Sequence, residues 1–183
     1  TAHHHQHQRR PDMLPEVGHS YVDISSGHTA SSIALALHLM RAELAAVSEN
    51  LVERVETELE QRIIAPLETG AEYWWMRKER LNNWAPWSCA SILGVACFIL
   101  EDSERLARLA WRLMGIVDDI VDSYGEDGGC DEGPAYWNHA AGQVLIFLEH
   151  LHLRTGGRID VFDHPKLHEL ARYIERVHLG GPW

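Results

Sequence analysis

The sequence predicts an all-α protein, and three observations lead to this fold class. Apolar residues recur at helical spacing along most of the chain, and no segment shows the alternation of a β-strand. The predicted helices alternate between apolar on all sides and amphipathic, and short loops join them. Because a simple bundle would make every helix amphipathic, we expect a partial, incomplete α/α toroid of alternating inner and outer helices.

The first two expected helices form one such pair. Capping residues over 25–29 precede the segment 33–47, which is apolar on almost all sides and should therefore be buried. The next helix, 49–67, keeps its apolar residues on one face, as an outer helix would. Pro66 should end or kink this second helix, because its ring clashes with the preceding turn.

The remaining helices repeat the alternation. An inner helix is expected over 85–101 and an outer, amphipathic helix over 103–123. A third inner helix should start near Pro134, a residue favoured in the first helical turn. After a loop over 154–163, the last helix should carry Pro165 in its first turn. Its expected buried residues are Leu167, Leu170, Ala171, Ile174 and Val177.

The composition describes a globular protein with an acidic surface. With 183 residues, 45% of them hydrophobic, the chain is long enough to bury a core. The net charge of −11 argues against binding to nucleic acid or to an anionic membrane, so neither partner is expected. No apolar run is expected to reach the length of a membrane span. The odd set Cys89, Cys97 and Cys130 argues against a disulfide framework.

The two ends of the chain suggest a fragment of a longer protein. Residues 1–24 are expected to form a flexible N-terminal segment, and 25–183 the toroid domain, truncated at its C-terminus. The histidine-rich stretch 3–7 is interpreted as a flexible start or a tag remnant rather than a metal site. No signal peptide is visible, which favours the cytoplasm unless a missing N-terminus contains one. The end, 179–183, reads as a helix stop followed by the start of another segment.

Two polar clusters each precede an apolar helix. One covers 81–84 before the apolar run 90–100, and the other covers 127–139 before the run 140–151. The single helix 103–123 between them would take the chain across the domain and back, so both clusters should share one rim. Amides, a carboxyl, a phenol, an imidazole and indoles gathered there suit a carbohydrate site. The rim is expected to carry His28, Asn82, Asn83, Glu132, Tyr136 and His139.

Each of these residues also has a structural interpretation. Asn82 and Asn83 can simply cap the helix that follows, and Glu132 can be a favourable charge at a helix start. Tyr136 and His139 are three residues apart and share a helix face, where they can act as acid and base or only orient a sugar. The basic cluster of Arg77, Lys78 and Arg80 is either an anion-binding edge or a solvated loop.

The segment 118–122 matches the DDxxD pattern that binds magnesium diphosphate in terpene synthases. Its residues Asp119 and Asp122 continue the polar face of a helix, and no second metal motif of the expected kind is found. We therefore interpret Asp118, Asp119 and Asp122 as solvated surface and expect no metal and no cofactor. A diphosphate enzyme is kept as a remote alternative.

The two polar clusters resemble the heparinase II/III-like polysaccharide lyases, a family that includes alginate lyase-like toroids. The resemblance rests on Asn82-Asn83-Trp84, on the motif Asp127-Gly128-Gly129-x-x-Glu132-Gly133-Pro134-x-Tyr136-Trp137, and on the loop 155–163; it extends from about His28 to the end. It implies an incomplete α/α toroid, followed in full-length members by β-sandwich domains. It also implies β-elimination of a uronate-containing polysaccharide.

The resemblance assigns roles to the residues of this chain. Asn83, with Asn82 behind it, matches the neutraliser of the substrate carboxylate, and Glu132 matches the motif carboxyl. Catalytic candidates are Asn83, Glu132, Tyr136 and His139; substrate-binding candidates are Asn82, Trp84, Trp87, Arg77, Arg80 and Trp137. The expected partners are an acidic polysaccharide or oligosaccharide and the missing C-terminal part of the same protein. That part should supply further catalytic groups, so the fragment alone is expected to be inactive.

Two other functions stay open from the residues. A glycoside hydrolase would need two carboxylates flanking the scissile bond, whereas Asp131 and Glu132 are adjacent in the sequence. The other is a non-catalytic carbohydrate-binding or helical interaction domain.

Overall fold

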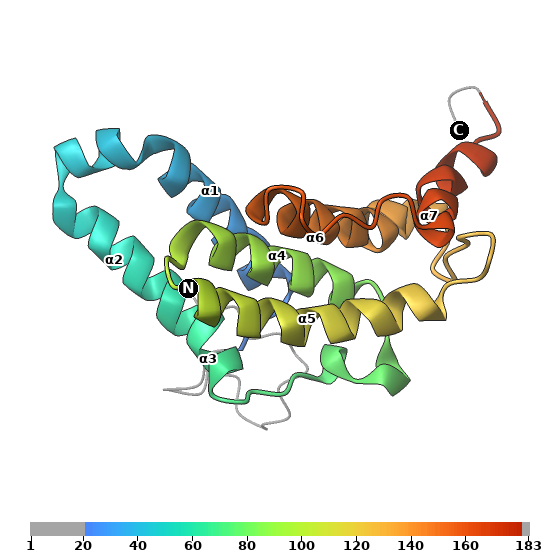
Figure 1. Ribbon diagram of the computed structural model, residues 1–183, viewed down its shortest axis with the longest axis horizontal. Helices are drawn as coiled ribbons and strands as arrows, with labels where there is room; N and C mark the ends of the chain where they lie inside the picture. The colour runs from blue at the N-terminus through green and yellow to red at the C-terminus, as the bar shows by residue number, and fades with distance from the viewer. Residues whose placement is uncertain (1–20, 181–183) are drawn as a thin grey trace. The chain divides into compact units, whose positions relative to one another are not determined.

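The computed structural model describes residues 21–180, and these residues form helices joined by turns and loops, without a β-strand (Figure 1). The predicted all-α fold class is therefore confirmed for the described part of the chain. The toroidal arrangement of the helices stays a prediction. The histidine-rich stretch 3–7 and the last residues, 181–183, lie outside the described residues.

The chain divides into two compact units. Unit 1 contains the residues up to Trp74 together with Ser91–Trp111, and unit 2 contains Trp75–Ala90 together with the residues from Arg112 onward. The candidate site residues, apart from His28 on the first helix, belong to unit 2. The two units are described separately below.

Unit 1 begins with a capped helix. Helix α1 (Ile24–Val47) packs against α2 (Glu49–Leu59). Asp23 caps α1, because its Oδ1 accepts the Ser26 N–H at 2.7 Å and the Ser26 Oγ accepts the Asp23 N–H at 2.9 Å. Val22 and Asp23 are both buried. The segment 1–24 was expected to be flexible, but these two residues near its end pack against the unit.

Helix α1 is not buried as the sequence predicted. Its buried residues lie on one side, whereas Leu39 is 70% exposed and Val47 is 80% exposed. A helix that is apolar all round needs cover on every side, and packing within unit 1 covers only one. Among the described helices, α1 is also the one with the length and composition to cross a membrane, which corrects the expectation that no apolar run is long enough. Core helices of soluble proteins and signal sequences share this length and composition.

Pro66 does not end the second predicted helix. Helix α2 continues into a π-helical turn, η1 (Glu60–Ile64), and then into α3 (Ala65–Glu68), which contains Pro66. The Ala65 N–H bonds to the Glu60 carbonyl, five residues back, so the helix is widened just before the proline. The wider turn accommodates a residue that has no N–H and needs extra room.

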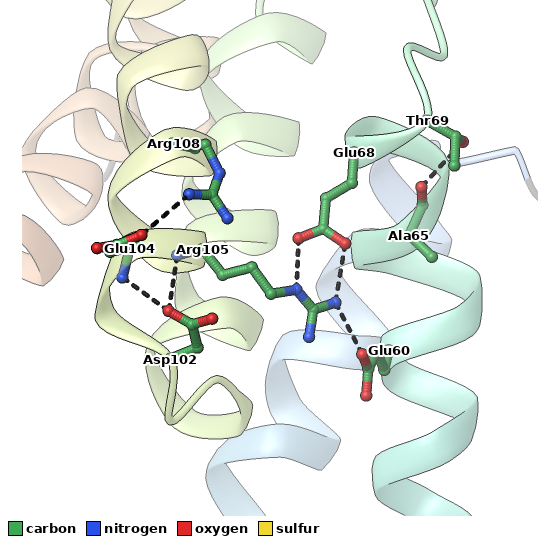
Figure 2. A network of polar contacts seen from close by, with 8 residues as sticks. All are labelled: Glu60, Ala65, Glu68, Thr69, Asp102, Glu104, Arg105 and Arg108. Atoms are coloured by element: carbon green, nitrogen blue, oxygen red, sulfur yellow. Dashed lines mark hydrogen bonds and ion pairs between the residues drawn. The ribbon is translucent and has the colours of Figure 1, made fainter.

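Arg105 on α5 (Ser103–Ser123) connects that helix to η1 and α3 (Figure 2). Arg105 donates from Nε and Nη2 to the two carboxylate oxygens of Glu68 at 2.7 and 2.8 Å, and from Nη2 to Glu60 at 2.7 Å. The Asp102 Oδ1 accepts backbone N–H groups of the first α5 turn. Hydrogen bonds from Arg105 lower the pKa of Glu68, and those to Glu68 and Glu60 raise the pKa of Arg105.

Helix α4 (Trp84–Ile99) is the buried centre that the sequence predicted. Residues up to Ala90 belong to unit 2 and those from Ser91 belong to unit 1. In both parts, most of the small and apolar side chains are almost fully inaccessible to solvent. The buried residues include Ala85, Cys89, Ala90, Ile92, Leu93, Val95 and Ala96.

Unit 2 differs from the prediction at its third inner helix. A short 3₁₀ helix, η4 (Pro134–His139), precedes α6 (Ala141–Arg154), and Ala140 with φ −115° and ψ −89° separates them. The helix therefore does not start at Pro134. Helix α7 (Pro165–Arg176) follows, packs on η4 and α6, and buries Leu167 and Leu170. Of the other residues expected in the α7 core, Ile174 and Val177 are half-buried and Ala171 is exposed.

The aromatic and basic connector forms two 3₁₀ turns, η2 (Trp74–Met76) and η3 (Lys78–Arg80). Within unit 2, the Lys78 ammonium pairs with the Asp119 carboxylate on α5. This ion pair attaches the connector to the helix that carries the DDxxD segment.

Candidate functional site

Two short segments of unit 2, 82–87 and 132–139, meet at two points. The Asn83 N–H donates to the Glu132 Oε2 at 2.9 Å. The rings of Trp87 and His139 stack with centroids 4.4 Å apart and planes 10° from parallel. The expectation that the two polar clusters come together is thus confirmed for these residues. We call these two segments the paired segments.

The first of the paired segments is a turn that starts α4. The Asn82 Oδ1 accepts the Trp84 N–H at 2.9 Å, a local bond that fixes the side chain of Asn82. Asn83 is only 6% exposed. Glu132 lies where the first N–H groups of α4 have no helical partner, and a negative charge is favoured at that end. The Glu132 carboxylate therefore holds the asparagine turn in place by accepting a hydrogen bond.

A small pocket opens beside this turn. Its volume is about 90 Å³, well below the range of roughly 300–1,000 Å³ that encloses a drug-sized ligand. Asn82 and Glu132 belong to its wall, whereas Asn83 does not. The structure thus places Asn82, and not Asn83, on the pocket wall, whereas the resemblance made Asn83 the residue that faces the substrate. The other lining residues are Leu81, Pro86, Ile120, Ser123, Tyr124, Gly129, Cys130 and Asp131.

Tyr124 and Cys130 are pocket residues that were not candidates from the sequence, although Cys130 lies within the polar cluster 127–139. Burial raises the pKa of Tyr124 well above its usual range, and the neighbouring Cys130 and then Glu132 raise this pKa further. The phenol is protonated at neutral pH, and its side chain hydrogen-bonds with Cys130. The only sequence signal was an aromatic residue at the end of an amphipathic helix, next to Gly125, and such residues are common without function.

His139 and Tyr136 form an aromatic edge beside the stacked Trp87. The Tyr136 ring meets the His139 ring edge-on at 6.0 Å, as their spacing of three residues predicts. Tyr136 is 46% exposed. The His139 Nδ1 is buried and has no hydrogen-bond partner within the described part of the chain. Proton exchange with a bound molecule must therefore use the other ring nitrogen, Nε2.

The remaining predicted substrate-binding residues lie outside the pocket wall. The Trp137 Nε1 donates to the Leu170 carbonyl at 2.8 Å, so this indole anchors η4 to α7. Trp84 is half-buried at the start of α4. Arg77 and Arg80 are exposed on the connector. His28, also expected on the rim, is exposed on α1 in unit 1.

The DDxxD segment lies on the surface of α5. Asp118 and Asp122 are exposed as predicted, while Asp119 is half-buried and paired with Lys78. Among residues 21–180, no group of three or more histidine, cysteine or acidic side chains is placed to hold a metal ion. In the described residues, the DDxxD segment is therefore not part of a cluster of side chains that could hold a metal ion.

Gly128 positions the loop that carries Cys130 and Glu132. Its φ is +70°, and a Cβ at this position would lie 2.4 Å from the carbonyl carbon of Glu169 on α7. No other residue fits so close to the backbone of a neighbouring helix. The Asp127 Oδ1 also accepts the Gly129 N–H at 2.9 Å. The loop is thus fixed on one side by α7 and within itself by an Asx turn.

Comparison with known proteins leaves the family open. The chain matches no protein-family model and no curated protein at a significant level. The resemblance to heparinase II/III-like lyases therefore stays a prediction that rests on the motifs quoted above.

Proposed function

We propose that this chain is part of a polysaccharide lyase that cleaves a uronate-containing polysaccharide by β-elimination. The observation that carries the proposal is the meeting of the paired segments, with Asn82 on the pocket wall and Glu132 bonded to the Asn83 N–H at 2.9 Å. The contact joins residues 49 positions apart, and it gathers amide, carboxylate and phenol groups in one pocket.

The reaction needs a donor for the uronate carboxylate. A base removes the C5 proton, the electron pair forms a double bond between C4 and C5, and the C4–O bond breaks as an acid protonates the leaving oxygen. Negative charge accumulates on the carboxylate before the bond breaks, so a fixed donor there stabilises the transition state. The side chain of Asn82 is already held through its Oδ1, so its Nδ2 can donate without being reorganised.

Glu132 acts in this proposal as a positioning residue. Its carboxylate accepts the Asn83 N–H and holds the turn that presents Asn82. A carboxylate used in this way does not need to donate a proton to the substrate. Tyr124 adds a neutral hydroxyl, hydrogen-bonded to Cys130, on the same wall.

Tyr136 and His139 are the proposed groups for proton transfer or for sugar contact. The exposed phenol of Tyr136 and the Nε2 of His139 lie on the aromatic edge formed with Trp87. Aromatic faces pack against sugar rings, and exposed Arg77 and Arg80 provide positive charge for an acidic chain. The proposal includes further catalytic groups, and closure of the α/α toroid, from a C-terminal part of the same protein.

Binding to a defined oligosaccharide tests the proposal. The probe is a uronate tetrasaccharide, and its control is the same oligosaccharide with the carboxyl groups reduced to alcohols. We expect the chain to prefer the uronate, and Asn82→Ala to weaken binding about tenfold, or about 1.4 kcal/mol. The matched variant Asn50→Ala, an exposed asparagine on α2, should leave the dissociation constant unchanged. Equal affinity for both sugars would contradict the proposal.

Product analysis with a longer protein containing this chain tests the reaction type. A lyase releases an unsaturated uronate, which is measured by its ultraviolet absorbance. New reducing ends without that absorbance would indicate hydrolysis instead. Sugar binding that survives the combined loss of Asn82, Glu132 and His139 would indicate a binding domain of another kind.

A further inference from the structure

Unit 1 contains a second and larger cavity, a groove between α1 and α2. Its volume is about 580 Å³, within the range of roughly 300–1,000 Å³ that is typical of small-molecule sites. Ile33 on α1 is 42% exposed and Leu51 on α2 is 43% exposed, so the apolar walls are open to solvent. The apolar lining comes from Ala30, Ile33, Leu51, Val55, Leu59 and Ile63.

The charged groups of the groove have an excess of positive charge. Arg54, Glu58 and Arg62 all line it from α2. Glu58 pairs with Arg62, whereas Arg54 makes no ion pair with any residue in the described range 21–180. The groove therefore offers one uncompensated guanidinium beside an apolar wall, in a chain whose net charge is −11.

Hydroxyl groups on α1 face the same cavity. Ser25 and Thr29 belong to the lining at the end of α1 that starts with the Asp23 cap. Together with Arg54 they supply donors, while Glu58 is already occupied by Arg62. A guanidinium binds a carboxylate with two parallel hydrogen bonds, which a cation or a neutral chain cannot use.

We propose that this groove binds an amphipathic monoanion, an aliphatic carboxylate whose chain lies on the apolar wall and whose head group pairs with Arg54. Charge complementarity selects the anion, because the only unpaired charge that lines the described groove is positive. The volume and the apolar walls select a ligand with an aliphatic body. The proposal is independent of the polysaccharide site, since every lining residue belongs to unit 1.

Titration calorimetry with dodecanoate tests the proposal on the full chain. The matched probe is dodecyltrimethylammonium, which has the same chain length and the opposite charge; both are used below their critical micelle concentrations. We expect dodecanoate to bind at least about tenfold more tightly than the cation, and Arg54→Gln to remove this preference. Arg108→Gln, which removes an exposed guanidinium of unit 1 outside the groove, should leave both affinities unchanged.

A second variant tests the apolar wall. Ile33→Gln should weaken dodecanoate binding about tenfold while the melting temperature stays close to that of the parent, because this side chain is already 42% exposed. Equal binding of both probes, or dodecanoate binding that neither Arg54→Gln nor Ile33→Gln alters, would overturn the proposal. Sedimentation that shows a dimer, dissociated by Ile33→Gln and unaffected by dodecanoate, would assign the groove to a second copy instead.

Discussion

Two adjacent asparagines have different surroundings, and the difference decides what each can do. Asn82 lines the pocket and is fixed by its bond to the Trp84 N–H at 2.9 Å, whereas Asn83 is 6% exposed and contacts Glu132 through its backbone. Of the two asparagines, only Asn82 belongs to the pocket wall. At the residue scale, the proposed donor is therefore Asn82.

Replacing the two asparagines separately tests this distinction in a longer protein with lyase activity. Asn82→Ala should lower kcat about 10²–10³-fold, the typical effect of losing a fixed transition-state donor. Asn83→Ala keeps the backbone N–H that Glu132 accepts, so it should mainly lower the melting temperature. Equal kcat losses in both variants, measured by unsaturated-uronate absorbance, would reject the assignment. Near-normal turnover in Asn82→Ala would show that Asn82 is only a structural turn residue.

Gly128 provides a second prediction at the residue scale. Gly128→Ala should lower the free energy of unfolding by about 2 kcal/mol or more, because a Cβ at φ +70° would also overlap the Glu169 backbone. Urea unfolding measures this loss. The control is Gly70→Ala, which has φ +89° but an open environment and should cost less. An equal loss in both variants would mean that the dihedral angle alone, and not the contact, limits this position.

At the element scale, the Arg105 contacts connect α5 with the π-helical turn and α3 (Figure 2). The bidentate geometry needs a planar guanidinium, which lysine does not have. We expect Arg105→Lys to lower the free energy of unfolding by about 1 kcal/mol at neutral pH, because the pairs are partly solvated. Arg54→Lys on α2 is the comparison outside this network. An unchanged free energy of unfolding in Arg105→Lys would show that the bidentate geometry adds little stability.

The same network predicts a dependence of stability on pH. The folded-state pKa of Glu68 is lowered from its ordinary value of 4.5, chiefly by the hydrogen bonds from Arg105. Its contribution is fully present above the unfolded-state pKa and is lost as the pH falls through the lowered folded-state pKa. Urea midpoints measured from pH 6 down to about pH 3 should therefore decrease less in Glu68→Gln than in the parent. Parallel curves for the two proteins would rule out this contribution.

At the scale of the whole molecule, the net charge of −11 is the dominant electrostatic property. Like charges repel within a folded chain, and salt screens them; the Debye length falls from about 30 Å at 0.01 M to about 8 Å at 0.15 M ionic strength. We expect the melting temperature to rise over this range of sodium chloride. A falling melting temperature would mean that the attractive pairs, such as Arg105 with Glu68, outweigh the general repulsion.

The sequence alone predicted the local structure well. The helix expected over 103–123 has these bounds in α5, and the buried helix expected over 85–101 lies over Trp84–Ile99. Periodicity and capping act between residues a few positions apart, so they can be recognised directly in the sequence. The meeting of the two polar clusters was also predicted, because it depends only on a helix running out and back between them.

Tertiary structure decided which side chains face solvent and which groups meet. It left the outer side of α1 exposed, placed Asn82 rather than Asn83 on the pocket wall, and brought Tyr124 and Cys130 beside Glu132. The contacts of Arg105 with Glu60 and Glu68 join residues 45 and 37 positions apart. Burial and such distant contacts depend on how the elements pack, and the local pattern of residue types contains no information about the partner on the other side.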